Sequence, residues 1–195
     1  TTTTGDRWER LREALRPAFT HDALGRYGDR IASTTAAFVD EWDDGDRIDL
    51  YQEMRLLTVN ILADTLLDTD LRGDEHVVMD AADALVNRAN FRRPGQLFPD
   101  WVPTLAERRF ERTVKALDEF VDEILAQRHC RDSGNDVCSA LLAAHEEGKL
   151  TLAEVRHNVV ALLLAGHDSP SVALTYIWYV LADHPEVYAS LRDEY

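Results

Sequence analysis

The chain has 195 residues, of which 45% are hydrophobic and 29% charged, with 9 Gly, 6 Pro and 2 Cys. This length suits a single domain with a sizeable core, and the composition excludes collagen-like, disordered and disulfide-stapled proteins. With 21 Lys and Arg against 36 Asp and Glu, the net charge is −15. This charge excludes nucleic-acid binding over the whole surface, because phosphate backbones need a basic partner.

The acidic excess has an unusual make-up. Lysine occurs only at Lys115 and Lys149, so nearly all of the positive charge is arginine, and Asp outnumbers Glu by 22 to 14. A large negative charge with little lysine suits a protein kept soluble in concentrated salt, where screening weakens self-repulsion. The composition therefore favours a salt-loving source over the alternative of an ordinary acidic cytosolic protein.

Neither a secretory leader nor a membrane span is expected. Residues 1–4 are polar, lack an initiator Met and lead almost directly into a helix, which predicts an internal fragment of a cytoplasmic protein. The apolar stretch 159–182 is long enough to cross a bilayer, but Asp168 interrupts it. Because an Asp at the bilayer centre costs about 2.5–3.5 kcal/mol, a buried core helix is the better interpretation.

Apolar residues recur at three- and four-residue spacing along the chain, and strand signals are nearly absent. The first two helices are expected over about 6–19 and about 21–42. A third is expected to begin at a cap formed by Asp49, and a fourth to run over about 74–90. The second helix is expected to turn five side chains inward, namely Leu24, Tyr27, Ile31, Ala32 and Phe38.

Two capping boxes mark the starts of later helices. At 104–107 and again at 151–154, the sequence Thr-Leu-Ala-Glu lets the Thr side chain bond the amide three residues on, while the Glu reaches back. The first box predicts a helix to about His129, and the second predicts the longest helix, to about Ala182. The remaining segments are a Pro- and aromatic-rich loop at 91–103, a loop at 131–135, a short helix over about 136–147, and a helix from Pro185. These patterns predict eight helices and an all-α fold.

The segment 162–171 is the most unusual part of the longest helix. A small pair, Ala165 and Gly166, precedes a polar triplet and Pro170. Proline has no amide hydrogen for the Gly166 carbonyl, and its ring crowds that carbonyl, so the helix is expected to kink or open there. A flat ligand could approach along the small residues; the alternative is a tightly packed helix crossing. The adjacent His, Asp and Ser cannot form a hydrolase relay, because consecutive helix residues point about 100° apart.

The segment 165–169, Ala-Gly-His-Asp-Ser, resembles the central-helix motif of the cytochrome P-450 haem-thiolate monooxygenases, which is Ala or Gly, Gly, any residue, an acid and Thr. Other passages are similar in order and spacing: Trp8 and Arg12 match a Trp-x-x-x-Arg helix, the loop at 91–103 lies where the family has its substrate-access lid, and 183–186 resembles the next helix. The resemblance covers the whole chain. It implies the helical core of the P-450 fold, built round one long central helix, with residues 1–195 as a single fragment of a larger domain.

The resemblance also implies roles for individual residues. Trp8 and Arg12 would hold haem propionates, the alternative being a surface salt bridge beside a core Trp. Asp168 matches the acid that supplies protons for oxygen activation. Ser169 matches the Thr whose hydroxyl stabilises activated oxygen, and Pro170 replaces a second Thr or Ser. The small residues expected to border the cofactor are Ala165 and Gly166.

The iron ligand of the family is a cysteine in a loop preceded by a Glu-x-x-Arg helix, and by the resemblance both are expected only after Tyr195. Cys130 is expected to be an ordinary helix-end cysteine and Cys138 a half-buried core cysteine. The 7 histidines show no clustered ligand spacing that predicts a metal site. The resemblance therefore implies haem b as cofactor, with its axial cysteine outside this chain, and no metal ligand within it.

We therefore expect part of a monooxygenase that oxidises an apolar small molecule with dioxygen, inactive as a fragment alone. The resemblance implies a ferredoxin-like or flavoprotein electron donor, docking on an arginine cluster of the first helix; the alternative is pairing of these arginines with Glu9 and Glu13. The cluster comprises Arg7, Arg10, Arg12 and Arg16. The alternative functions are a non-catalytic helical ligand-binding or interaction domain, or a truncated remnant. A transcription regulator is disfavoured, because no short helix pair carries a basic recognition face.

Overall fold

The computed structural model describes residues 4–89, 105–129 and 134–194. Within these ranges the chain forms helices and no strand, which confirms the predicted all-α class. The helices are α1 (Asp6–Leu15), α2 (His21–Val39), α3 (Leu50–Leu62), α4 (Glu75–Ala89), α5 (Leu105–His129), α6 (Val137–Glu146), α7 (Leu152–Asp183) and α8 (Pro185–Glu194). A 3-10 turn, η1 (Arg16–Phe19), follows α1, and a π-helical turn, η2 (Ala63–Leu67), follows α3.

Polar side chains fix the starts of three helices. Asp49 accepts bonds from two amides of the first turn of α3, and Asp136 accepts one from the Ser139 amide in α6. At the start of α7, Thr151 and Glu154 form both bonds of the predicted capping box. Each such cap stabilises a helix by about 1 kcal/mol. The other box, at Thr104, and the loop at 91–103 lie outside the described residues.

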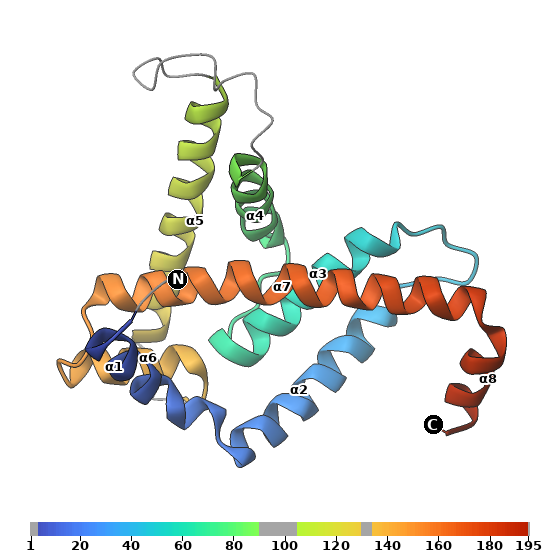
Figure 1. Cartoon of the computed structure of the whole chain (residues 1–195), viewed down its shortest axis with the longest axis horizontal. Helices are drawn as coiled ribbons and strands as arrows, with labels where there is room; N and C mark the ends of the chain where they lie inside the picture. The colour runs from blue at the N-terminus through green and yellow to red at the C-terminus, as the bar shows by residue number, and fades with distance from the viewer. Residues whose placement is uncertain (1–3, 90–104, 130–133, 195) are drawn as a thin grey trace.

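The longest helix, α7, organises the molecule as predicted. Figure 1 shows α7 crossing the whole fold, with α4 and α5 projecting to one side and α1, α2 and α6 on the other. The helix α3 packs across α7 in the most extensive helix–helix contact of the described chain. Their buried side chains join those of α5 and α6 in one core, which includes Val59, Leu67, Val121, Leu141, Val159 and Leu163.

The predicted inward face of α2 is only partly correct. Tyr27 is buried, but Leu24 and Ile31 are 52% and 41% exposed. The buried stripe follows Ala23, Tyr27 and the half-buried Arg30, so two of its three members lie one residue before the expected Leu24 and Ile31. One residue turns a helix by about 100°, so Leu24 and Ile31 face away from α3 and η2. Of the other two predicted residues, Ala32 is exposed and Phe38 is half-buried.

The helix was expected to kink or open at Pro170, and the expected opening is absent. The helix α7 continues without interruption from Leu152 to Asp183, and Figure 1 shows one continuous ribbon. The proline still offers no amide hydrogen to the Gly166 carbonyl. The helix α3 packs against α7 at this stretch, where Leu62 lies next to Gly166. In the described ranges, no helix is long and apolar enough to cross a membrane.

Candidate active site

The helices α3 and α7 approach closely at Gly166. A methyl group at this position would lie 2.7 Å from Cδ1 of Leu62 and 3.0 Å from its Cδ2. Real side-chain atoms do not approach so closely, so glycine is what lets the two helices meet here. The sequence left open whether the small residues admit a flat ligand or a tightly packed helix crossing. At Gly166 the contact with Leu62 supports the helix crossing.

His167 lies inside the same crossing and is fully buried. Its Nδ1 is 2.8 Å from the Leu163 carbonyl, which only accepts, so Nδ1 donates this bond. Its Nε2 is buried without a partner in the described part of the chain. From α3, the Thr58 hydroxyl donates to the His167 carbonyl at 3.0 Å. His167, which stands at the motif position where the family accepts any residue, is thus a buried packing residue in this chain.

The opposite side of α7 carries the other motif residues. Ala165 and Ser169 are exposed and Asp168 is half-buried. Two residues turn a helix by about 200°, so Ser169 faces away from His167 and from α3. The backbone beneath is held by the Ser171 hydroxyl, which donates to the Asp168 carbonyl at 2.7 Å. The structure therefore brings Ala165, Asp168 and Ser169 onto one open face and leaves Gly166 at its edge.

Trp8 and Arg12 lie together on α1, as their spacing predicts. The Arg12 guanidinium stacks over the Trp8 indole, with its Cζ 5.0 Å from the ring centroid. Both side chains are exposed and line a groove with Leu11, Leu15 and Phe19. Trp8, at 44% exposure, is not a core residue within this chain. A stacked guanidinium and an indole N–H offer donors suited to a carboxylate ligand.

An ion pair joins α1 to α7. Arg7 Nε is 3.0 Å from Glu154 Oε1, in the first turn of α7. The amide and hydroxyl of Thr151, with a smaller contribution from Arg7, lower the pKa of Glu154. At 1.5 Å per residue, Glu154 and Asp168 are about 21 Å apart along the helix. The residues on α1 and those at the middle of α7 therefore form two separate groups.

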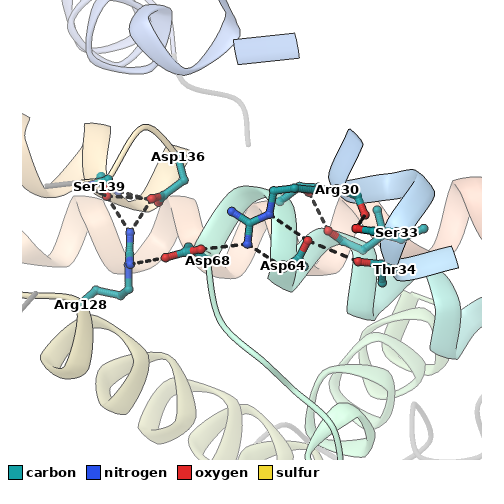
Figure 2. A network of polar contacts seen from close by, with 11 residues as sticks. Arg30, Ser33, Thr34, Asp64, Asp68, Arg128, Asp136 and Ser139 are labelled. Atoms are coloured by element: carbon teal, nitrogen blue, oxygen red, sulfur yellow. Dashed lines mark hydrogen bonds and ion pairs between the residues drawn. The ribbon is translucent and has the colours of Figure 1, made fainter. Parts of the chain in front are cut away.

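A buried ionic network lies below α5 and was not predicted from the sequence. Figure 2 shows Arg128 of α5 pointing at Asp68, Asp136 and Ser139. Arg128 donates to Asp68 and Ser139 at 2.8 Å each and also binds Asp136. The guanidinium is 5% exposed, so these acceptors replace the water it has lost. No local pattern could have indicated the pair, because 60 residues separate Arg128 from Asp68.

Asp68 joins this network to α2. Its second oxygen accepts a bond from Arg30 at 2.8 Å, and Arg30 also binds Asp64 through two bonds of 2.6 and 2.9 Å. Hydrogen bonds to Asp64 and Asp68 raise the pKa of Arg30, against the effect of its partial burial. Asp68 has φ of 48°, in the left-handed region that non-glycine residues rarely occupy. Two guanidinium groups thus hold a strained residue at the end of η2.

The cysteines and histidines offer no metal centre in the described ranges, where no group of three or more His, Cys, Asp or Glu could hold an ion. Cys138 is fully buried in the core rather than half-buried as predicted, because α6 packs it against the rest of the core. Burial, and secondarily the charge of Asp136, raise the pKa of its thiol to about 11. Cys130 lies outside the described residues.

Comparison with known proteins identifies the family. The sequence model of the family described as cytochrome P-450 matches residues 1–195, so the chain belongs to the cytochrome P-450 family. Cyclooctatin synthase of Streptomyces melanosporofaciens is 30% identical, over 95% of this chain and 42% of that protein. Cyclooctat-9-en-7-ol 5-monooxygenase of the same organism is 31% identical, over 90% of this chain and 40% of that protein.

Solved structures agree with this assignment. The heme domain of a cytochrome P-450 mutant superposes with a TM-score of 0.80 at 25% identity, covering 97% of this chain and 43% of that chain. The chain therefore has the fold of part of a P-450 heme domain. It spans less than half the length of these relatives.

Proposed function

We propose that residues 1–195 form part of a haem-thiolate monooxygenase that oxidises an apolar small molecule with dioxygen and reducing equivalents. The family membership and the monooxygenase name of a relative support this function. The observation that carries it is the open face of α7, on which Ala165, Asp168 and Ser169 lie together away from α3. The proposal includes a cytoplasmic location, which fractionation of the source cells would test.

In this proposal, described residues of α1 and α7 would hold a haem. When bound, haem b supplies the iron chemistry of oxygen activation, with an axial cysteine from outside this chain. Trp8 and Arg12 would bind the propionates, since their donors are exposed on one helix face. Ala165 presents a face of α7 without side-chain bulk, which suits a flat ligand. Gly166 would act on that face indirectly, by allowing α3 to pack close behind it.

Two side chains would handle protons at this face. The Asp168 carboxylate, which is half-buried, would accept and pass on protons, as an amide could not. The Ser169 hydroxyl would donate a hydrogen bond toward the bound oxygen substrate. Serine lacks the methyl group that restricts threonine rotamers, so its hydroxyl is held less firmly.

Variants of the full-length protein test these roles. Asp168→Asn should slow dioxygen consumption, and Ser169→Ala should raise the peroxide formed per reduced cofactor oxidised. Ser169→Thr should lower that ratio, provided that the added methyl fits beside Pro170. Equal ratios for the wild type and all three variants would show that both residues are only structural. The chain 1–195 alone should not give the carbon monoxide spectrum of a thiolate-ligated haem; ligation by Cys130 or Cys138 would contradict the assignment.

The electron donor is proposed to dock on α1. Arg7 pairs with Glu154 of α7 rather than with an acid of its own helix, and Arg10 and Arg16 are exposed. An acidic ferredoxin-like protein or flavoprotein is the partner that such a cluster favours in so acidic a chain. Reversing the charges of Arg10 and Arg16 should slow reduction at low salt without changing substrate affinity. Unchanged reduction kinetics would contradict this docking surface.

A further inference from the structure

Three consecutive carbonyl groups of α7 beside the proposed catalytic residues have bonding that an ordinary helix turn lacks: one is denied its amide partner, and two accept a side-chain hydroxyl. The Gly166 carbonyl receives no amide bond, because residue 170 is proline. The next carbonyl, of His167, accepts a bond from the Thr58 hydroxyl at 3.0 Å. The carbonyl after that, of Asp168, accepts one from the Ser171 hydroxyl at 2.7 Å. Side-chain hydroxyls therefore bind the two carbonyls that follow the one whose amide partner Pro170 removes.

Of these two hydroxyls, only that of Thr58 comes from another helix. Thr58 is 5% exposed and lies in α3, one turn before Leu62, which contacts Gly166. Its single proton is shared among three carbonyls: Met54 at 2.8 Å, Arg55 at 3.1 Å and His167 at 3.0 Å. The first two are usual partners of a helical threonine within its own turn. The third links α3 to α7.

A second threonine of the same segment provides a natural comparison. Thr65 in η2 is 4% exposed, and its hydroxyl donates to the Ile61 carbonyl at 2.6 Å within its own turn. The two threonines thus share burial and local bonding. They differ in the contact that Thr58 makes with the His167 carbonyl.

We propose that Thr58 is a positioning residue, whose hydroxyl fixes the rotation of α7 so that Asp168 and Ser169 face the open side. This inference rests on the proposed function. His167 and Ser169 are about 200° apart on one helix, so any rotation that releases the first displaces the second by the same angle. Thr58 contacts neither Asp168 nor Ser169 through its side chain in the described structure, and acts through the backbone between them.

The test uses the full-length protein with Thr58→Val, Thr58→Ser and the matched control Thr65→Val. Valine keeps the shape of threonine and removes its hydroxyl, while serine keeps the hydroxyl. Hydrogen exchange should become several-fold faster at the amides of Ser171 and Val172 in Thr58→Val, with little change in Thr65→Val. The peroxide formed per cofactor oxidised should rise several-fold in Thr58→Val at unchanged KM, and return toward the wild-type ratio in Thr58→Ser.

Three results would overturn the proposal. Equal exchange at these amides in Thr58→Val and Thr65→Val would show that the hydroxyl does not hold this turn, whether or not the protein is active. Faster exchange with a wild-type peroxide ratio would show that Thr58 only stabilises the crossing. If the wild type binds haem but neither it nor any variant consumes dioxygen, the proposed function itself fails, and the absence of all turnover distinguishes that result from equal peroxide ratios.

Discussion

Gly134 lies next to the buried guanidinium of Arg128, and a side chain at this position would overlap the side chains around it. An added methyl group would lie 2.8 Å from Arg128 Nη2 and 2.9 Å from Ser139 Oγ, and would overlap Asp136. We expect Gly134→Ala to destabilise the fold by about 2–4 kcal/mol, because it overpacks the site and disturbs a buried ion pair. Urea unfolding of the purified protein measures this change.

The matched control is Gly25→Ala on α2. Nothing lies within 4 Å of the position that a methyl group would take at Gly25. Alanine is the better helix former by about 0.5–1 kcal/mol, so this variant should be slightly more stable than the wild type. If both variants change stability by the same amount, the network around Arg128 does not depend on Gly134.

Cys138 makes the stability depend on pH in the alkaline range. Burial raises the pKa of its thiol to about 11, whereas an unfolded thiol ionises near 8.5–9. Above that lower value only the unfolded chain loses the proton, so stability should fall by about 2–3 kcal/mol as the pH rises from about 9 to 11. Cys138→Ala should remove this part of the slope, which urea unfolding at several pH values would show. An identical slope in both proteins would contradict the assignment.

At the residue scale, the sequence predicts local features and misses distant ones. The caps at Asp49 and Thr151 were predicted because each involves amides within three residues. The pairing of Arg128 with Asp68 was not, because it depends on how η2 and α5 meet in space. The resemblance placed Asp168 and Ser169 on the long helix, but the contact of Thr58 with that helix crosses 109 residues and required the structure.

At the scale of elements, the crossing of α3 and α7 depends on complementary sizes at Gly166 and Leu62. We expect Gly166→Ala to destabilise the protein by about 1–3 kcal/mol, since the new methyl group would overlap Leu62 Cδ1 at 2.7 Å. Leu62→Ala alone should also destabilise it, by leaving a cavity. The double variant should be more stable than the sum of the two changes predicts. A double-mutant cycle of unfolding free energies measures this coupling.

Additive effects would mean that Leu62 moves aside without cost, and that another contact sets the distance between the helices.

The same crossing explains why the sequence predicted the length of α7 but not its continuity at Pro170. Hydrophobic periodicity and the capping box set its length, whereas the proline rule predicted an opening at Pro170. Packing by α3 keeps the helix continuous there, and sequence spacing carries no information on that packing.

At the scale of the whole molecule, a large apolar surface covers the second half of α7 and α8. Folded monomers rarely expose a contiguous patch of this kind. The exposed side chains include Tyr176, Ile177, Trp178, Tyr179, Val180, Val187, Tyr188 and Leu191. Since the chain spans less than half the length of its relatives, we expect further segments of a longer protein to cover this surface. Leu24 and Ile31 of α2 were predicted to be buried and are exposed in the described chain. We expect further segments of a longer protein to cover them as well.

The net charge of −15 belongs to the molecule as a whole and leads to a prediction about salt. Repulsion among many exposed carboxylates opposes folding, and molar salt reduces its range to about 3 Å. The partly buried pairs, such as Arg156 with Asp122 at 2.6 Å, are screened much less. We therefore expect the urea midpoint of the full-length protein to rise between about 0.1 and 1 M NaCl, as the salt-loving interpretation requires.

Salt also strengthens hydrophobic burial in any protein, so a variant is needed to separate the two effects. Asp29, Asp40 and Asp44 are exposed, and no side-chain hydrogen bond or ion pair involves them in the described structure. Replacing all three with Asn removes three negative charges without disturbing the core. The variant should be more stable than the wild type at low salt and should gain less on adding NaCl, because less repulsion remains to be screened. Equal salt dependence in the two proteins, or a fall in stability with salt, would show that the acidic surface is no adaptation to concentrated salt.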